Sequence, residues 1–200
     1  MNLCVYGAAS NKISNKYKEI GIKLGEEMAK RDHALVFGGG ASGMMGALAQ
    51  GIYNGGGKSI AVSPTFFKVD GILFDKCTEY VYTDTMRERK QKMEELSDGF
   101  IVAPGGIGTM DEFMEILSLR QLDRHQKPIA ILNIDHYYDP LLKLLENMID
   151  ENFMDKANLE FCPAFDDIDS MLSYLETVKC ERSNLFVTRL DPNEFGKSEK

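Results

Sequence analysis

A short stretch of the sequence places anion-binding groups directly before a carboxylate. It consists of Pro104, Gly105, Gly106, Ile107, Gly108, Thr109, Met110, Asp111 and Glu112. The glycines offer backbone N–H donors and Thr109 offers a hydroxyl, which is the donor chemistry of a phosphate site at the start of a helix. Glu112 adds an acidic group beside that site. The alternative is a capping box, in which Thr109 and Glu112 satisfy free N–H groups at a helix start.

A second glycine-rich stretch could also contact phosphate. It consists of Gly38, Gly39, Gly40, Ala41, Ser42 and Gly43. The spacing matches the dinucleotide fingerprint G-x-G-x-x-G, but that fingerprint follows the first strand and needs an acidic residue about 20 positions later. Here the stretch follows the second expected strand, and the later region reads Val62-Ser63-Pro64. Phosphate or nucleotide contact is favoured over an NAD site, and glycines that only allow tight turns are the remaining alternative.

A basic cluster lies at the start of a further expected helix, where Arg87, Arg89 and Lys90 are close together. A helix N-terminus carries a partial positive charge and ordinarily favours acidic side chains. The basic start therefore indicates a negatively charged group nearby. The alternative is a solvated charged face with pairs such as Glu88 and Lys92.

The elements that position these residues follow from alternating patterns. The expected strands are Leu3–Tyr6, Ala34–Phe37, Ser59–Val62, Tyr80–Tyr82, Phe100–Ala103 and Ile129–Leu132, and the expected helices include Lys16–Arg31, Asp111–Leu122, Tyr137–Ile149 and Ser170–Leu175. This alternation predicts an α/β fold of the Rossmann-like, doubly wound kind, with a mostly parallel sheet and helices on both faces. Three strands run into glycine-rich loops, and such sheets bind ligands at the carboxyl ends of their strands.

Length and composition exclude several classes of protein. Two hundred residues, 44% of them hydrophobic, fit one domain, which we expect to span residues 1–182 before a polar tail at 183–200. The net charge of −8 leaves no basic field for nucleic acid or an anionic membrane. The four cysteines are far apart and the three histidines are not spaced as ligands, so neither a metal site nor a disulfide framework is expected. Without a signal peptide or an apolar span, the sequence predicts a cytoplasmic protein.

The ordered motifs also identify a family. They are Gly38-Gly39-Gly40 with Gly43-Met44-Met45-Gly46, then Met86 with Arg89-Lys90, then the stretch from Pro104 to Glu112, reinforced by His125 with Lys127-Pro128 and by Tyr137-Tyr138-Asp139. This combination resembles the LOG (Lonely Guy) family of cytokinin riboside 5′-monophosphate phosphoribohydrolases, formerly labelled lysine decarboxylases. The segment Thr65–Cys77 differs from the pattern of many members, so the resemblance does not predict the preferred base.

The resemblance implies a hydrolase without cofactor that cleaves the N-glycosidic bond of nucleoside 5′-monophosphates, namely AMP, N6-modified cytokinin riboside monophosphates, or both. The products are the free base and ribose 5-phosphate. Arg89 and Glu112 are implied as catalytic residues. The implied substrate-binding residues are Gly38, Gly39, Gly40, Gly43, Met86, Lys90, Gly105, Gly106, Ile107, Gly108, Thr109 and Ser118.

The chemistry of this bond fits a carboxylate, because the sugar develops a positive charge as the bond breaks. Glu112 is the expected stabilising group, while Asp84, Asp111 and Glu115 are open as the acid that protonates the base. The main alternative is a non-catalytic nucleotide- or molybdenum-cofactor-binding carrier. A pyridoxal-phosphate decarboxylase would need a Schiff-base lysine that nothing here marks. The resemblance and the apolar faces of two helices together predict a homodimer or a higher homo-oligomer.

Overall fold

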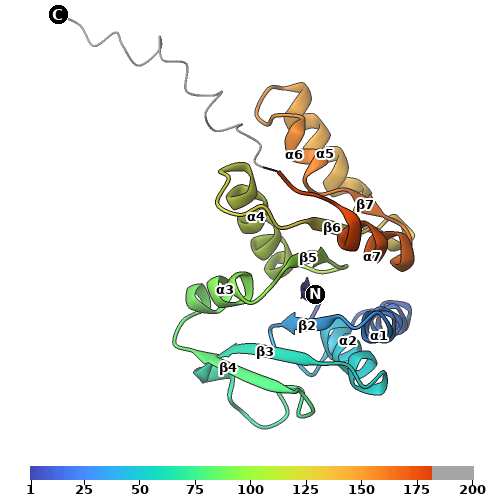
Figure 1. The fold of residues 1–200 in the computed structure, drawn as a ribbon, viewed down its shortest axis with the longest axis vertical. Helices are drawn as coiled ribbons and strands as arrows, with labels where there is room; N and C mark the ends of the chain where they lie inside the picture. The colour runs from blue at the N-terminus through green and yellow to red at the C-terminus, as the bar shows by residue number, and fades with distance from the viewer. Residues whose placement is uncertain (182–200) are drawn as a thin grey trace, which may run out of the picture.

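The computed structural model describes residues 1–181, and the expected tail at 183–200 lies outside the described residues. A seven-stranded parallel sheet forms the centre of the molecule (Figure 1). Its strands are β1 (Asn2–Tyr6), β2 (Ala34–Phe37), β3 (Ser59–Pro64), β4 (Glu79–Thr83), β5 (Gly99–Val102), β6 (Ile129–Leu132) and β7 (Ala164–Phe165). Their order is β4-β3-β2-β1-β5-β6-β7, which confirms the predicted doubly wound fold.

Helices cover both faces of this sheet. They are α1 (Asn15–Lys30), α2 (Gly43–Asn54), α3 (Met86–Glu95), α4 (Ile107–Gln121), α5 (Asp139–Asp150), α6 (Ala157–Glu160) and α7 (Ile168–Thr177), with short 3-10 turns η1 (Thr65–Phe67) and η2 (Ile134–His136). Helices α1, α2 and α7 contribute to one hydrophobic core, whereas α3, α4 and α5 pack on the other. Figure 1 shows α1 and α2 side by side. Helices α3 and α4 come later in the sequence.

Alternation along the strands divides side chains between the two cores. On β1, Leu3 and Val5 belong to the core under α1 and α2, while Cys4 and Tyr6 belong to the core under α3 and α4. All four side chains are at most 2% exposed. A strand with both faces covered needs a continuous apolar run, and this is why the sequence of β1 lacks polar residues after Asn2.

The expected boundaries hold best for the strands. The prediction for β2 and for β6 matches the structure, while β3 extends beyond Val62 to Pro64. Helix α4 begins at Ile107 rather than at Asp111, because Gly106 takes the extended N-cap conformation. Strand β7 was not predicted, since two residues are too few to show a periodic pattern.

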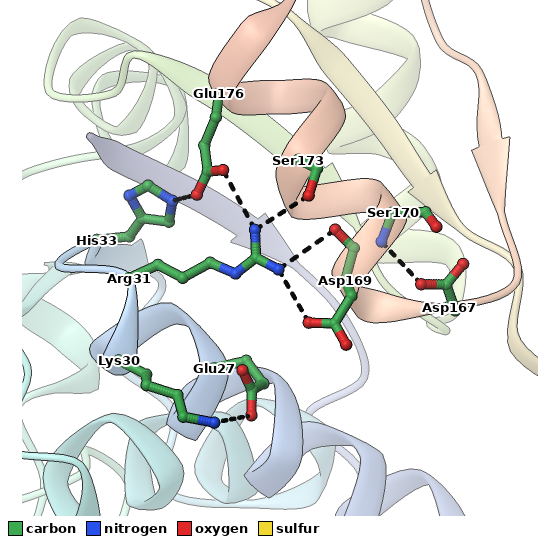
Figure 2. Close-up of polar contacts among 9 residues, drawn as sticks. All are labelled: Glu27, Lys30, Arg31, His33, Asp167, Asp169, Ser170, Ser173 and Glu176. Atoms are coloured by element: carbon green, nitrogen blue, oxygen red, sulfur yellow. Dashed lines mark hydrogen bonds and ion pairs between the residues drawn. The ribbon is translucent and has the colours of Figure 1, made fainter.

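A polar cluster fixes the C-terminal helix α7 beside the end of α1 (Figure 2). Arg31 contacts Asp169 at 2.9 Å and Glu176 at 3.2 Å, and Nε2 of His33 lies 2.8 Å from the other oxygen of Glu176. Asp167 caps α7 by accepting a hydrogen bond from the N–H of Ser170 at 2.7 Å. Because His33 immediately precedes β2, these contacts stabilise the amino edge of the sheet, opposite the edge where ligands of such folds bind.

Candidate active site

A cavity of about 420 Å³ opens at the carboxyl edge of the sheet. The end of β1, the loop after β2, the segment between β3 and β4, and helices α3 and α4 line it. The strand order reverses at β1, since β2 lies on one side of it and β5 on the other. Ligands of open α/β sheets bind at such a reversal because the flanking loops diverge and leave a crevice.

An ion pair between α3 and α4 lies in the wall of this cavity. The NH1 group of Arg89 donates a hydrogen bond to Oε1 of Glu112 at 2.9 Å, and the Nε–H group of Arg89 donates to the carbonyl of Val62 at 3.2 Å. The two side chains are only 13% and 11% exposed. The structure therefore brings together the two residues that the sequence predicted as catalytic.

Burial sets the electrostatics of Glu112. Loss of hydration raises the pKa of this carboxyl above its ordinary value, while the charge of Arg89 and its hydrogen bond act in the opposite direction. A carboxylate in this position is less hydrated than one on the surface, so it interacts more strongly with a positive charge that develops beside it. Arg89 holds the carboxylate in one orientation and favours its charged form.

Gly38 makes room for this ion pair. A Cβ atom at Gly38 would collide with the guanidinium group of Arg89. The absence of a side chain at this position, rather than backbone freedom, thus allows Arg89 to reach both β3 and Glu112. Gly40 also lines the cavity, and Met86 begins the stripe Met86, Arg89 and Met93 that α3 turns towards it.

The other glycines of this loop act on the backbone. Gly39 and Gly43 have φ angles of +79° and +65°, a region that favours glycine. Neither residue lines the cavity. The N–H group of Gly43 donates to Oδ1 of Asn11 at 3.0 Å, which joins the second loop to the loop after β1.

The alternative interpretation of Thr109 and Glu112 as a capping box is wrong. Thr109 lies inside α4, whose N-cap is Gly106, and Glu112 contacts Arg89 instead of the helix start. A capping box is present at α3, where the hydroxyl of Thr85 accepts from the N–H of Glu88 at 3.2 Å. The carboxylate of Glu88 accepts in turn from the N–H of Thr85 at 3.3 Å. Glu88 therefore stabilises the helix start, and no Glu88–Lys92 pair is needed to explain it.

The negative group expected near the basic start of α3 is the acidic face of α4. Besides the Arg89 pair, Nζ of Lys90 lies 3.1 Å from Asp111 and 2.5 Å from Glu115. The hydrogen bond with Glu115 raises the pKa of Lys90. Lys90 and Ser118 line a second, open depression of about 530 Å³ that includes the Ile107 side chain. The structure thus places Lys90, Ser118 and Ile107 outside the cavity of Arg89 and Glu112.

The glycine stretch before α4 also lies outside that cavity. Gly105 packs against Thr109, since a Cβ atom at Gly105 would overlap the hydroxyl of Thr109. The carbonyl of Gly105 accepts a hydrogen bond from the hydroxyl of Tyr137 at 2.7 Å. Thr109 is buried, whereas Gly106, Ile107 and Gly108 are exposed at the start of the helix. Their role in binding phosphate stays a prediction.

Several lining residues were not predicted. Tyr6 ends β1 and lines the cavity, and burial raises the pKa of its phenol well above the ordinary value. Ser42 belongs to the predicted loop but was not singled out, and Phe67, Ile72 and Leu73 come from the segment that differs from the family pattern. A run of large apolar side chains outside any helical or strand pattern was the signal available for them.

Two further findings concern residues 1–181. No three His, Cys, Asp or Glu side chains gather there in a way that could hold a metal ion, and all four cysteines are free thiols. None of the helices in that range has the length and apolar character needed to cross a bilayer.

Comparison with known proteins identifies the family. The family model described as possible lysine decarboxylase matches residues 45–175. The chain is 34% identical over 174 residues to probable cytokinin riboside 5′-monophosphate phosphoribohydrolase LOGL9 of Oryza sativa subsp. japonica, a match that covers 87% of this chain and 77% of that protein. It is 38% identical over 154 residues to cytokinin riboside 5′-monophosphate phosphoribohydrolase LOG1 of Arabidopsis thaliana, covering 76% and 71%. In the rice relatives LOGL2 and LOGL6 the match spans 62% and 61% of the relative.

Solved structures share the fold at lower identity. The molybdenum cofactor carrier protein of Chlamydomonas reinhardtii aligns with a TM-score of 0.66 and 17% identity over 87% of this chain and 94% of its own. The molybdenum cofactor binding protein of Rippkaea orientalis aligns with a TM-score of 0.66 and 19% sequence identity, and the alignment covers 88% of this chain and 95% of that protein. At such identities the similarity shows the fold alone. The sequence matches show more: this chain belongs to the LOG family, whose family model is described as possible lysine decarboxylase.

Proposed function

We propose that this chain hydrolyses the N-glycosidic bond of nucleoside 5′-monophosphates and releases the free base and ribose 5-phosphate. The observation that carries the proposal is the buried Arg89–Glu112 pair in the wall of a cavity at the reversal of strand order. The printed names of the relatives, which are cytokinin riboside 5′-monophosphate phosphoribohydrolases, support the same reaction.

In the proposed reaction the bond between C1′ and the base nitrogen breaks and the base leaves with the electron pair. A water oxygen bonds to C1′ and loses a proton, and the base nitrogen takes up a proton. Positive charge develops on the sugar before water adds. Glu112 stabilises this charge because its carboxylate is largely withdrawn from water. Arg89 acts through Glu112 by fixing its orientation. Asp111 and Glu115 are paired with Lys90 outside the cavity, so neither is assigned as the acid that protonates the base.

The 5′-phosphate provides binding energy away from the reacting bond, and this energy can hold the sugar in position. The loop Gly38–Ser42 is the proposed contact because it borders the cavity and leads into the N-terminus of α2. The positive end of the helix dipole favours an anion at this terminus. The proposed substrates are AMP, N6-modified relatives of AMP, or both.

The non-catalytic carrier is the alternative. The structural similarity to molybdenum cofactor carriers shows only the fold, whereas the Arg89–Glu112 pair is an arrangement that binding alone does not require. A panel of AMP, IMP, GMP, CMP and UMP, assayed for released base and ribose 5-phosphate, tests the proposal. Release of both products in equal amounts from at least one nucleotide is expected. Tight nucleotide binding with no release of base would support the carrier instead.

We also propose a homodimer or a higher homo-oligomer. Ile107 is 91% exposed, and it borders the open depression with Met110 and Met114 on the same helix. An exposed apolar surface of this kind is typical of a subunit interface. Light scattering should give at least twice the mass of the 22.5 kDa chain, and a fully active monomer would contradict the proposal. A cytoplasmic location stays a prediction from the sequence.

A further inference from the structure

The segment between β3 and β4 forms an ordered wall of the cavity. The turn η1 follows β3 directly, and the N–H group of Lys68 donates to the carbonyl of Thr65 at 3.0 Å. Further along, the N–H group of Ile72 donates to the carbonyl of Val69 at 3.1 Å. These hydrogen bonds join the backbone of the segment to itself at two points.

The far end of this segment is tied to the second glycine loop. The N–H group of Ala41 donates to the carbonyl of Ile72 at 2.9 Å, and the N–H group of Phe74 donates to the carbonyl of Gly39 at 2.8 Å. Leu73, between these two bonds, pairs with Gly40 as an isolated antiparallel bridge. The proposed phosphate loop and the wall are therefore one hydrogen-bonded unit.

This wall presents only apolar side chains to the cavity. Its lining residues are Phe67, Gly71, Ile72 and Leu73. The polar lining side chains all come from other elements, namely Tyr6, Ser42, Arg89 and Glu112. Since η1 follows β3 and α4 follows β5, on opposite sides of β1, the cavity has an apolar side at this wall and carries Glu112 on the opposite side.

Phe67 is the aromatic side chain of that apolar side. It is 38% exposed and Ile72 is 42% exposed, so both present apolar surface that a ligand in the cavity would cover. The base of a nucleotide has flat faces that stack on aromatic rings, whereas its phosphate and ribose are polar. A nucleotide that places its sugar at Glu112 thus has its base available for the opposite, apolar side.

We propose that Phe67 is the residue on which the base of the nucleotide stacks, and that Phe67 together with Ile72 and Leu73 determines which base is accepted. This inference rests on the proposed function. Because the wall offers no polar side chain to read the edge of the base, it selects by stacking area and shape. Purines, which have the larger ring system, are then preferred over pyrimidines.

The adjacent aromatic residue provides a matched control. Phe66 has its ring centroid 4.7 Å from that of Phe67, is 56% exposed and does not line the cavity. The variants are therefore Phe67→Ala, Phe67→Tyr and Phe66→Ala, each checked for its melting temperature. KM and kcat are measured for AMP and CMP, and ribose 5-phosphate is used as a competitive inhibitor that lacks a base.

For Phe67→Ala we expect KM for AMP to rise by about tenfold, which is at the low end for loss of base–aromatic stacking because the ring is partly exposed. The preference for AMP over CMP should narrow, and inhibition by ribose 5-phosphate should stay the same. Phe67→Tyr should restore KM, and Phe66→Ala should change it by no more than about twofold, since it removes exposed apolar surface outside the cavity.

Three results would overturn the inference. They are an unchanged KM in Phe67→Ala, equal effects of Phe67→Ala and Phe66→Ala, and a loss of ribose 5-phosphate inhibition that matches the loss for AMP. Calorimetric binding of AMP separates this inference from the proposed function. If the wild type binds AMP without hydrolysing any nucleotide and Phe67→Ala weakens that binding, the hydrolase fails while the base contact stands. A wild type that binds no nucleotide refutes both.

Discussion

Replacing Glu112 by Gln removes the charge of this side chain while it keeps the length and an acceptor oxygen. That oxygen can still accept the hydrogen bond that Arg89 donates at 2.9 Å. A hydrogen bond to a charged group is worth about 1 kcal/mol more than a neutral one. The substitution also leaves the guanidinium group of Arg89, which is 13% exposed, without an opposite charge beside it, and this costs further stability. We therefore expect the melting temperature to fall by about 4–8 °C.

The expected effect on turnover is larger. If the carboxylate stabilises positive charge on the sugar, its loss should slow hydrolysis by about a hundredfold or more, equivalent to roughly 2.7 kcal/mol of transition-state stabilisation. Affinity for AMP should largely survive, because the phosphate contacts proposed for the Gly38–Ser42 loop do not involve Glu112. A change confined to kcat is the signature of an interaction made in the transition state.

The control removes a similar charge from the same helix. Glu115→Gln acts one turn further along α4, where the carboxylate pairs with Lys90 outside the cavity. Melting temperature, AMP affinity and hydrolysis rate are measured on the same preparation of each variant. Near wild-type hydrolysis by Glu112→Gln, or equal losses in Glu112→Gln and Glu115→Gln, would show that Glu112 has no special role in the reaction.

The dependence on pH gives a second measurement of the same prediction. Burial raises the pKa of Glu112, so the carboxylate takes up a proton at a higher pH than an exposed glutamate does. Wild-type kcat/KM should therefore fall as the pH is lowered through this raised pKa. The residual activity of Glu112→Gln should lack that acid limb, since glutamine does not titrate.

The remaining predictions concern the phosphate, the room for Arg89 and the start of α3. AMP should be cleaved more than a hundredfold better than adenosine, because several charge-assisted contacts at about 1.5–3 kcal/mol each are lost without the phosphate; equal turnover would contradict a phosphate site. Gly38→Ala should displace Arg89 and reduce activity more than Gly40→Ala does, because the methyl group added at Gly40 meets no atom within 4 Å. Steady-state kinetics of the two variants, measured side by side, check this difference. Thr85→Ala should lower the melting temperature by about 2–4 °C through loss of the capping contact with Glu88, and an unchanged transition in calorimetry would refute that role.

The fold could be predicted from the sequence because its signals are local. Ile129–Leu132 is a short apolar run between polar segments, and the structure confirms it as β6 without a change of boundary. The start of α4 could not be predicted in the same way, since Thr109 offers a capping hydroxyl while Gly106 offers only its backbone conformation. The capping-box alternative for Thr109 and Glu112 failed because a motif four residues long does not show where the helix begins.

The site was predictable to the extent that its residues lie in compact motifs. Gly38, Gly40, Met86, Arg89 and Glu112 line one cavity, while their roles in catalysis and binding stay predictions. The apolar wall was not predictable, because residues 65–74 have no repeating pattern and depend on hydrogen bonds to a loop about thirty positions earlier. Such contacts are set by tertiary structure, which single-sequence patterns do not record.

The meeting of Arg89 and Glu112 is a consequence of the strand order. Arg89 follows β4 at one edge of the sheet, whereas Glu112 follows β5, which pairs with the central β1. The chain between β4 and β5 must therefore cross β3, β2 and β1, and α3 lies in this connection on the same face as α4. This crossing explains why Arg89 bonds both to the carbonyl of Val62 in β3 and to Glu112 in α4. The ion pair needs both the two motifs and the long crossover, so neither motif by itself could place the reactive carboxylate.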